Sequence, residues 1–228
     1  MFHSQVKKKL VAVVLGAACL ALSGTALALS SITLSFNGVT NTSTFNTALG
    51  KSSLFVEVMQ LTSPSQVAFK FTNTSSSSLT DVYFDDGTLL GIAYITGSGA
   101  GVAFTKGAAP PNLPGGNLLT PAFVTTVGFS ADSNPPVSLN GVTAGESLTI
   151  TFDLQTSKTY ADVLSALALP NGGGTGDLRI GVHVQSFPGG GSESFVNTPV
   201  PEAETYAMML AGLGLVGFMA RRRSRSLV

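Results

Sequence analysis

The two ends of the chain each place an apolar segment beside a basic cluster, which leaves only the middle for a folded core. At the C-terminal end, the 15 uncharged residues 206–220 precede Arg221, Arg222, Arg223 and Arg225. A helix over residues 206–220 would span about 22 Å, less than the roughly 30 Å of a bilayer's hydrocarbon core. It also lacks the polar face of a helix that packs on a soluble core. The segment is therefore too short for a comfortable permanent span. Because hydrophobic mismatch costs only a fraction of a kcal/mol per Å, it can still cross the bilayer, and we predict a temporary transmembrane helix.

Residues 1–28 predict a secretory signal peptide, with a signal helix at the N-terminus. Three lysines at 7–9 precede the apolar stretch 10–22, and Ala26-Leu27-Ala28 forms an A-x-A cleavage site. We expect the Sec translocon to export the chain and signal peptidase to release a mature N-terminus at Leu29. An alternative treats Cys19 as a lipidated cysteine, although Gly16 stands where a lipobox has a large aliphatic residue.

The distribution of charge places the body outside the cytoplasm. Both basic clusters favour the cytoplasmic side of the membrane, so the segment between them is exported. Residues 29–200 contain five cationic and ten acidic side chains, and an acidic body argues against nucleic-acid binding. The one cysteine, Cys19, lies in the predicted signal peptide, so the mature protein would form no disulfide.

The C-terminal segment resembles the PEP-CTERM sorting signal. Val200-Pro201-Glu202 precedes the apolar segment and the arginines close it, with Ala203 where the family usually has proline. In that family, found in Gram-negative and other exopolysaccharide-making bacteria, an exosortase, which is a membrane protease or transpeptidase, is thought to act at the motif. The resemblance implies that residues 200–202 mark the processing region and that Arg221 to Arg223 stop the chain in the inner membrane, which it occupies transiently. It also implies a final location at the cell surface or in the extracellular matrix.

Residues 29–198 form the predicted body, for which alternation and turn signals predict an all-β fold. We expect a two-sheet antiparallel β-sandwich, jelly-roll-like, with one short helix over residues 159–169 capped by Thr159 and Asp162. The polar stretch 192–198 is interpreted as a stalk. The expected strands are 31–36, 54–58, 67–71, 81–84, 91–95, 102–105, 123–129, 148–154 and 179–187. Parts of the body, such as Val82-Tyr83-Phe84-Asp85-Asp86-Gly87, resemble PEP-CTERM proteins of undefined function, which implies no activity.

Clustered acids in the body suggest one candidate metal site. Asp81, Asp85, Asp86 and Asp132 could offer the oxygens that Ca²⁺ prefers, although Asp86-Gly87 is also a common turn. We therefore predict a weak structural calcium site and no other cofactor.

No catalytic site is expected in the body. His183 is the only histidine left after removal of the signal peptide, and the chain has no G-x-S-x-G motif and too few partners for zinc. The chain also lacks tryptophan and has four tyrosines, so it is poorly equipped to stack on sugar rings.

These observations predict an exported, exosortase-sorted protein that is not an enzyme. We expect a structural or interaction role at the surface or in the exopolysaccharide matrix of a biofilm, with exopolysaccharide as one candidate partner. The alternatives are a secreted adhesin or carbohydrate-binding module and, less favoured, a hydrolase that uses acids such as Asp85 and Asp86.

Overall fold

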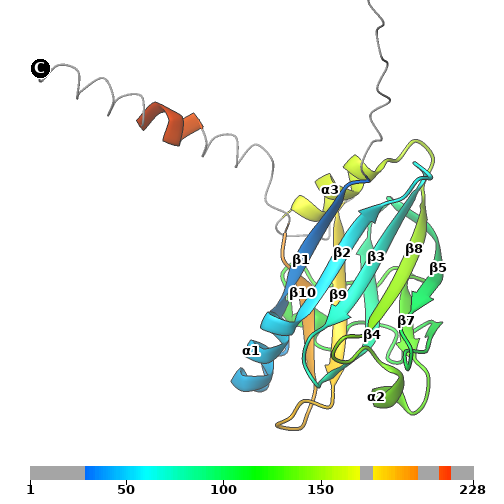
Figure 1. The fold of residues 1–228 in the computed structure, drawn as a ribbon, viewed down its shortest axis with the longest axis vertical. Coiled ribbons are helices and arrows are strands. Elements are labelled where there is room, and N and C mark those ends of the chain that lie inside the picture. Colours follow the sequence, from blue (N-terminus) through cyan, green and yellow to red (C-terminus); the bar gives the residue numbers. More distant parts are fainter. Residues whose placement is uncertain (1–28, 170–176, 200–210, 217–228) are drawn as a thin grey trace, which may run out of the picture.

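The computed structural model describes residues 29–169, 177–199 and 211–216, and its main feature is a curled antiparallel sheet of ten strands (Figure 1). The prediction of an all-β antiparallel fold is confirmed. The strands are β1 Ser31–Gly38, β2 Leu54–Gln60, β3 Gln66–Asn73, β4 Ser78–Asp86, β5 Leu90–Ser98, β6 Phe104–Lys106, β7 Ser130–Ser133, β8 Ser147–Leu154, β9 Leu178–Gln185 and β10 Glu193–Asn197. The helices are α1 Thr44–Ser53, α2 Val137–Asn140, α3 Tyr160–Ala168 and the short 3₁₀ helix η1 Gly116–Leu118.

Strand β1 joins the two halves of this sheet. The spatial order is β5-β8-β3-β2-β1-β10-β9-β4-β7-β6. Residues 31–35 of β1 pair with β2, whereas residues 36–38 pair with β10. The two layers expected from the sequence are therefore two halves of one sheet that share a strand.

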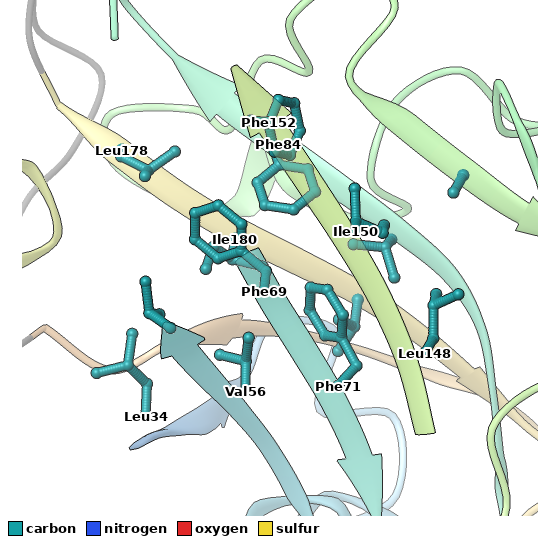
Figure 2. Close-up of a cluster of buried hydrophobic side chains, with 14 of the residues drawn as sticks. Leu34, Val56, Phe69, Phe71, Phe84, Leu148, Ile150, Phe152, Leu178 and Ile180 are labelled. Atoms are coloured by element: carbon teal, nitrogen blue, oxygen red, sulfur yellow. The ribbon is translucent and has the colours of Figure 1, made fainter. Parts of the chain in front are cut away.

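The two halves pack face to face through aromatic side chains (Figure 2). Phe84 of β4 lies 5.1 Å from Phe69 of β3 and 4.7 Å from Phe152 of β8, measured between ring centroids. Both contacts are edge-to-face, the arrangement that the ring quadrupoles favour. The strands contribute to this core at every second residue, as in β2, where Leu54, Val56 and Val58 are all buried.

One predicted strand, residues 123–129, is wrong. Its apolar side chains alternate in sequence, but the segment lies in the long connection between β6 and β7. Some of its side chains are buried there and others are exposed. Phe123 is buried in a small second cluster with Val39, Tyr83 and Leu113, whereas Val127 is 96% exposed. The neighbouring strand β7, which was not predicted, begins only at Ser130.

The expected stalk at residues 192–198 is also wrong, because it contains strand β10. This strand lies between β1 and β9, and Glu193 and Ser194 are buried within it. The segment looks polar, but its polar groups are satisfied by partners that are distant in sequence. The Glu193 carboxylate accepts hydrogen bonds from the backbone N–H groups of Thr42 at 3.1 Å and Ser43 at 2.6 Å.

The predicted helix near residue 160 is confirmed, but it is not the only helix. α3 begins with a capping box in which Thr159 and Asp162 each accept a hydrogen bond from the other's backbone. Helix α1 was missed because it is largely polar, with only Asn46, Gly50 and Ser53 buried. Gly50 permits close contact with β10, since a Cβ at that position would lie 2.1 Å from the Phe195 ring.

Candidate functional site

Most of the predicted sorting tail lies outside the described residues. This holds for the motif Val200, Pro201 and Glu202, for the arginines 221–223 and for the signal peptide 1–28. Within the predicted transmembrane segment 206–220, the structure describes residues 211–216, which are helical and exposed. Among the described residues, none of the helices is sufficiently long and apolar to cross a membrane.

The root of the tail is described and is bonded to the sheet. The Thr198 N–H donates to the Ser35 carbonyl at 2.8 Å, and the two hydroxyl oxygens of these residues lie 3.2 Å apart. Asn197 is buried, and its side chain accepts a hydrogen bond from the Ile180 N–H at 2.7 Å and donates to the Thr198 carbonyl at 3.1 Å. The chain is therefore fixed up to Thr198, at the end of β10.

The next residue, Pro199, is exposed at the edge of an open hollow. The apolar side chains of Leu119, Leu169, Leu178 and Val196 line much of this hollow. The polar lining residues are Thr120, Arg179 and Asn197. The tail thus leaves the body beside a rim that combines apolar side chains with polar ones, including Arg179.

Arg179 fastens the long connection between β6 and β7 to the outer face of the sheet. Its guanidinium forms an ion pair with Asp85 and donates to the carbonyls of Pro121 at 2.8 Å and Ala122 at 2.7 Å. It also lies 5.2 Å from the centre of the Phe123 ring. Asp85 is therefore engaged in a structural ion pair, and its side chain is only 13% exposed.

Asp81 and Asp132 form a second, separate acidic pair. They are register partners on β4 and β7, and the Thr80 hydroxyl donates to Asp81 at 2.8 Å. Burial raises the pKa of Asp81 to about 7, the bond from Thr80 opposes this rise, and the nearby Asp132 carboxylate adds to it. Burial also raises the pKa of Tyr83, whose hydroxyl donates to the Pro110 carbonyl at 3.2 Å.

Asp86 occupies a third environment, at the turn from β4 to β5. Its carboxylate accepts from the N–H groups of Leu89 at 3.0 Å and Leu90 at 2.8 Å. Burial raises the pKa of Asp86, although these hydrogen bonds oppose the rise. The turn interpretation of this residue accounts for its contacts.

The four predicted calcium ligands do not converge on one point. Asp81 and Asp85 are four residues apart on β4, a separation of about 13 Å along a strand. Within the described part of the chain, no three His, Cys, Asp or Glu side chains are grouped so as to hold a metal ion. The calcium site remains a prediction that this geometry does not support.

A row of polar residues across β4, β9 and β10 could not be found from the sequence. Asp81, His183 and Ser194 are register neighbours, and the His183 Nδ1 lies 3.1 Å from the Ser194 hydroxyl. Burial lowers the pKa of His183, although the charge of Glu193 opposes this effect. The row has the residue types of a hydrolytic triad, but Ser194 is fully buried, so a substrate could not reach its hydroxyl.

Comparison with known families identifies the tail. Residues 199–223 match the PEP-CTERM protein-sorting motif, which confirms the expectation from residues 200–202, the apolar segment and the arginines. The motif implies an exported protein that is processed by an exosortase and sorted to the cell surface. No curated protein and no solved structure matches the chain. The match therefore identifies the tail and assigns no activity to the body.

Proposed function

We propose that this chain, with its PEP-CTERM motif at residues 199–223, is cut by an exosortase near Pro201 and Glu202 and leaves behind a body with a non-enzymatic role. The body would serve as a structural or interaction component at the cell surface or in the exopolysaccharide matrix. The observation that carries this proposal is that the motif begins directly after the last sheet-bonded residue, Thr198. Processing there would release the whole sheet intact.

The contacts of the body favour a structural role. The charged side chains Arg179, Asp85 and Glu193 of the body are used in internal contacts, namely the ion pair of Arg179 with Asp85 and the hydrogen bonds of Glu193 with the loop before α1. Groups that are saturated by internal partners stabilise a fold but are poorly placed for proton transfer to a substrate. This argues against the hydrolase alternative that depends on Asp85.

Mass spectrometry of the mature protein from its own host tests the sorting step. We expect a C-terminus near residues 200–203 on the exported form and none of the peptides that contain Arg225. A Glu202→Gln variant should accumulate uncut, whereas the matched variant Glu204→Gln, two residues further on, should be cut normally. An exported protein that keeps Arg225 would contradict the proposal.

Binding of the mature protein to a glycan array separates the two roles considered for the body. A purely structural component should bind no glycan above background. Saturable binding to one glycan class would instead favour the adhesin or carbohydrate-binding alternative.

A further inference from the structure

The sorting motif follows the folded body without a spacer. Thr198 keeps its backbone hydrogen bond to Ser35, and the matched motif begins at the next residue. Strand β10, to which Thr198 is attached, is also an internal strand of the sheet, between β1 and β9. The segment on the N-terminal side of the motif is thus part of the folded body.

The reach of the chain is correspondingly short. From Thr198 to Pro201 are three residues, which span at most about 11 Å when fully extended. This is about the diameter of one helix with its side chains. An enzyme that encloses residues 200–202 would therefore have to work within about one helix diameter of the sheet, beside Leu119 and Leu169, unless more chain became free.

Enzymes and other proteins that bind a peptide in extended form use its main-chain N–H and C=O groups, together with pockets for alternate side chains. The groups needed on the N-terminal side of the motif are those of residues 197–199. In the folded body the groups of Thr198 are occupied, because its N–H donates to the Ser35 carbonyl and its carbonyl accepts from the Asn197 side chain.

Building on the proposed sorting function, we propose that the processing enzyme also binds Asn197, Thr198 and Pro199, and that it does so after this end of β10 detaches from β1. Local opening at the end of a strand costs less than global unfolding, since few contacts are broken. The contacts that must break are the Thr198 bonds to Ser35, the strand pairing of Asn197 with Phe36, and the bond from the Ile180 N–H to the Asn197 side chain. The rest of β10, held by the buried Glu193 to Phe195, remains in place.

A reversible crosslink tests this proposal in the full-length protein. The hydroxyl oxygens of Ser35 and Thr198 lie 3.2 Å apart, so the double variant Ser35→Cys/Thr198→Cys places two thiols face to face across β1 and β10. The predicted mature chain has no other cysteine. We expect at least a tenfold slower conversion to the processed form in the oxidised variant, and recovery when dithiothreitol is added to the cells.

A matched crosslink serves as the control. The hydroxyls of Thr96 and Thr151 lie 2.8 Å apart on β5 and β8, so Thr96→Cys/Thr151→Cys introduces the same chemistry away from β10. This control should be processed at the wild-type rate. Normal processing of the Ser35–Thr198 variant, with its disulfide demonstrated in the precursor, would overturn the proposal.

A spacer separates restricted access from misfolding. A flexible Gly-Ser insert of about eight residues between Thr198 and Pro199 supplies free main-chain N–H and C=O groups beside the motif, in place of those of Asn197 and Thr198, without opening β10. It should restore processing of the crosslinked variant and accelerate that of the wild type, whereas no restoration would contradict the proposal. If the wild-type chain also keeps its C-terminus, the proposed processing by an exosortase is contradicted. That result differs from one in which only the crosslinked variant stays unprocessed.

Discussion

The buried carboxyl group of Asp81 makes the stability of the folded protein depend on pH. Its pKa is raised to about 7 by burial and by Asp132, compared with about 3.9 in an unfolded chain. The folded protein therefore holds this proton more tightly than the unfolded chain does, so the stability conferred by protonated Asp81 is lost as the pH rises from about 4 to 7.

An Asp81→Asn variant should remove this dependence on pH. We expect its free energy of unfolding to equal that of the wild type near pH 4 and to exceed it by about 4 kcal/mol at pH 8. Urea unfolding of both mature proteins across this range measures the difference. The exposed helix cap Asp162, whose pKa is lowered by its bonds to Thr159, provides the control: Asp162→Asn should leave the slope between pH 5 and 8 unchanged. An Asp81→Asn variant with the wild-type slope would refute this explanation.

Arg179 illustrates a second residue-scale effect, in which one side chain holds a long connection. An Arg179→Met variant would leave Asp85 charged and nearly buried, and the carbonyls of Pro121 and Ala122 would lose their donor. We expect a loss of about 3 kcal/mol in unfolding free energy and faster proteolysis between residues 107 and 129. Removal of the exposed Lys51 by Lys51→Met should change neither measurement, and equal behaviour of the two variants would count against the role of Arg179.

At the scale of secondary structure elements, Glu193 links β10 to the start of α1. Burial alone would raise its pKa, but hydrogen bonds from Thr40, Thr42 and Ser43 lower it, so the carboxylate stays ionised. We expect Glu193→Gln to destabilise the protein by about 2 kcal/mol, because an amide is a weaker acceptor for several N–H and O–H groups.

Amide hydrogen exchange locates this effect. Exchange should accelerate in residues 42–47 of the Glu193→Gln variant, while the α3 end of the molecule stays protected. A Glu57→Gln change on β2 is the matched control and should leave α1 unaffected. Uniform acceleration over the whole chain would argue for a general loss of stability instead of a local link.

The elements that could be predicted from sequence are those whose signals are local. Helix α3 has its capping residues within three positions of each other, and strands such as β2 alternate between buried and partly exposed side chains. Strand β10 could not be predicted, because Glu193 is tolerated in the interior only through partners about 150 residues earlier. The row of Asp81, His183 and Ser194 was missed for the same reason, since it arises from strand register.

The sorting tail could be predicted because its signal lies in consecutive residues and does not depend on how the chain folds. The order of Pro201-Glu202, an apolar segment and arginines is contiguous, and the family match covers the same region. The predicted calcium site, in contrast, did not rest on a contiguous motif. Proximity of Asp81, Asp85, Asp86 and Asp132 depended on strand pairing, which instead distributes them among three environments.

At the scale of the whole molecule, the contact between the two halves of the sheet should dominate stability. Phe84 is fully buried and meets the rings of both Phe69 and Phe152. We expect Phe84→Ala to lower the free energy of unfolding by about 4 kcal/mol, through lost burial and the cavity that remains. The exposed Phe45, on α1, is the matched control, and Phe45→Ala should cost less than about 1 kcal/mol in the same thermal or urea denaturation. Similar losses in both variants would contradict the view that this interface carries the fold.

The central position of β10 also has a consequence for the order of events during export. A translocon delivers the chain from its N-terminus, so β1 emerges early and can pair with β2, but its residues 36–38 must wait for β10 until nearly the whole body has crossed. The sheet can join its two halves only when residues 193–197 arrive, and the sorting motif comes directly behind them. The sheet is therefore completed at nearly the same time as the sorting motif crosses the membrane. An enzyme that acts on the motif would then meet only chains whose whole body has been exported.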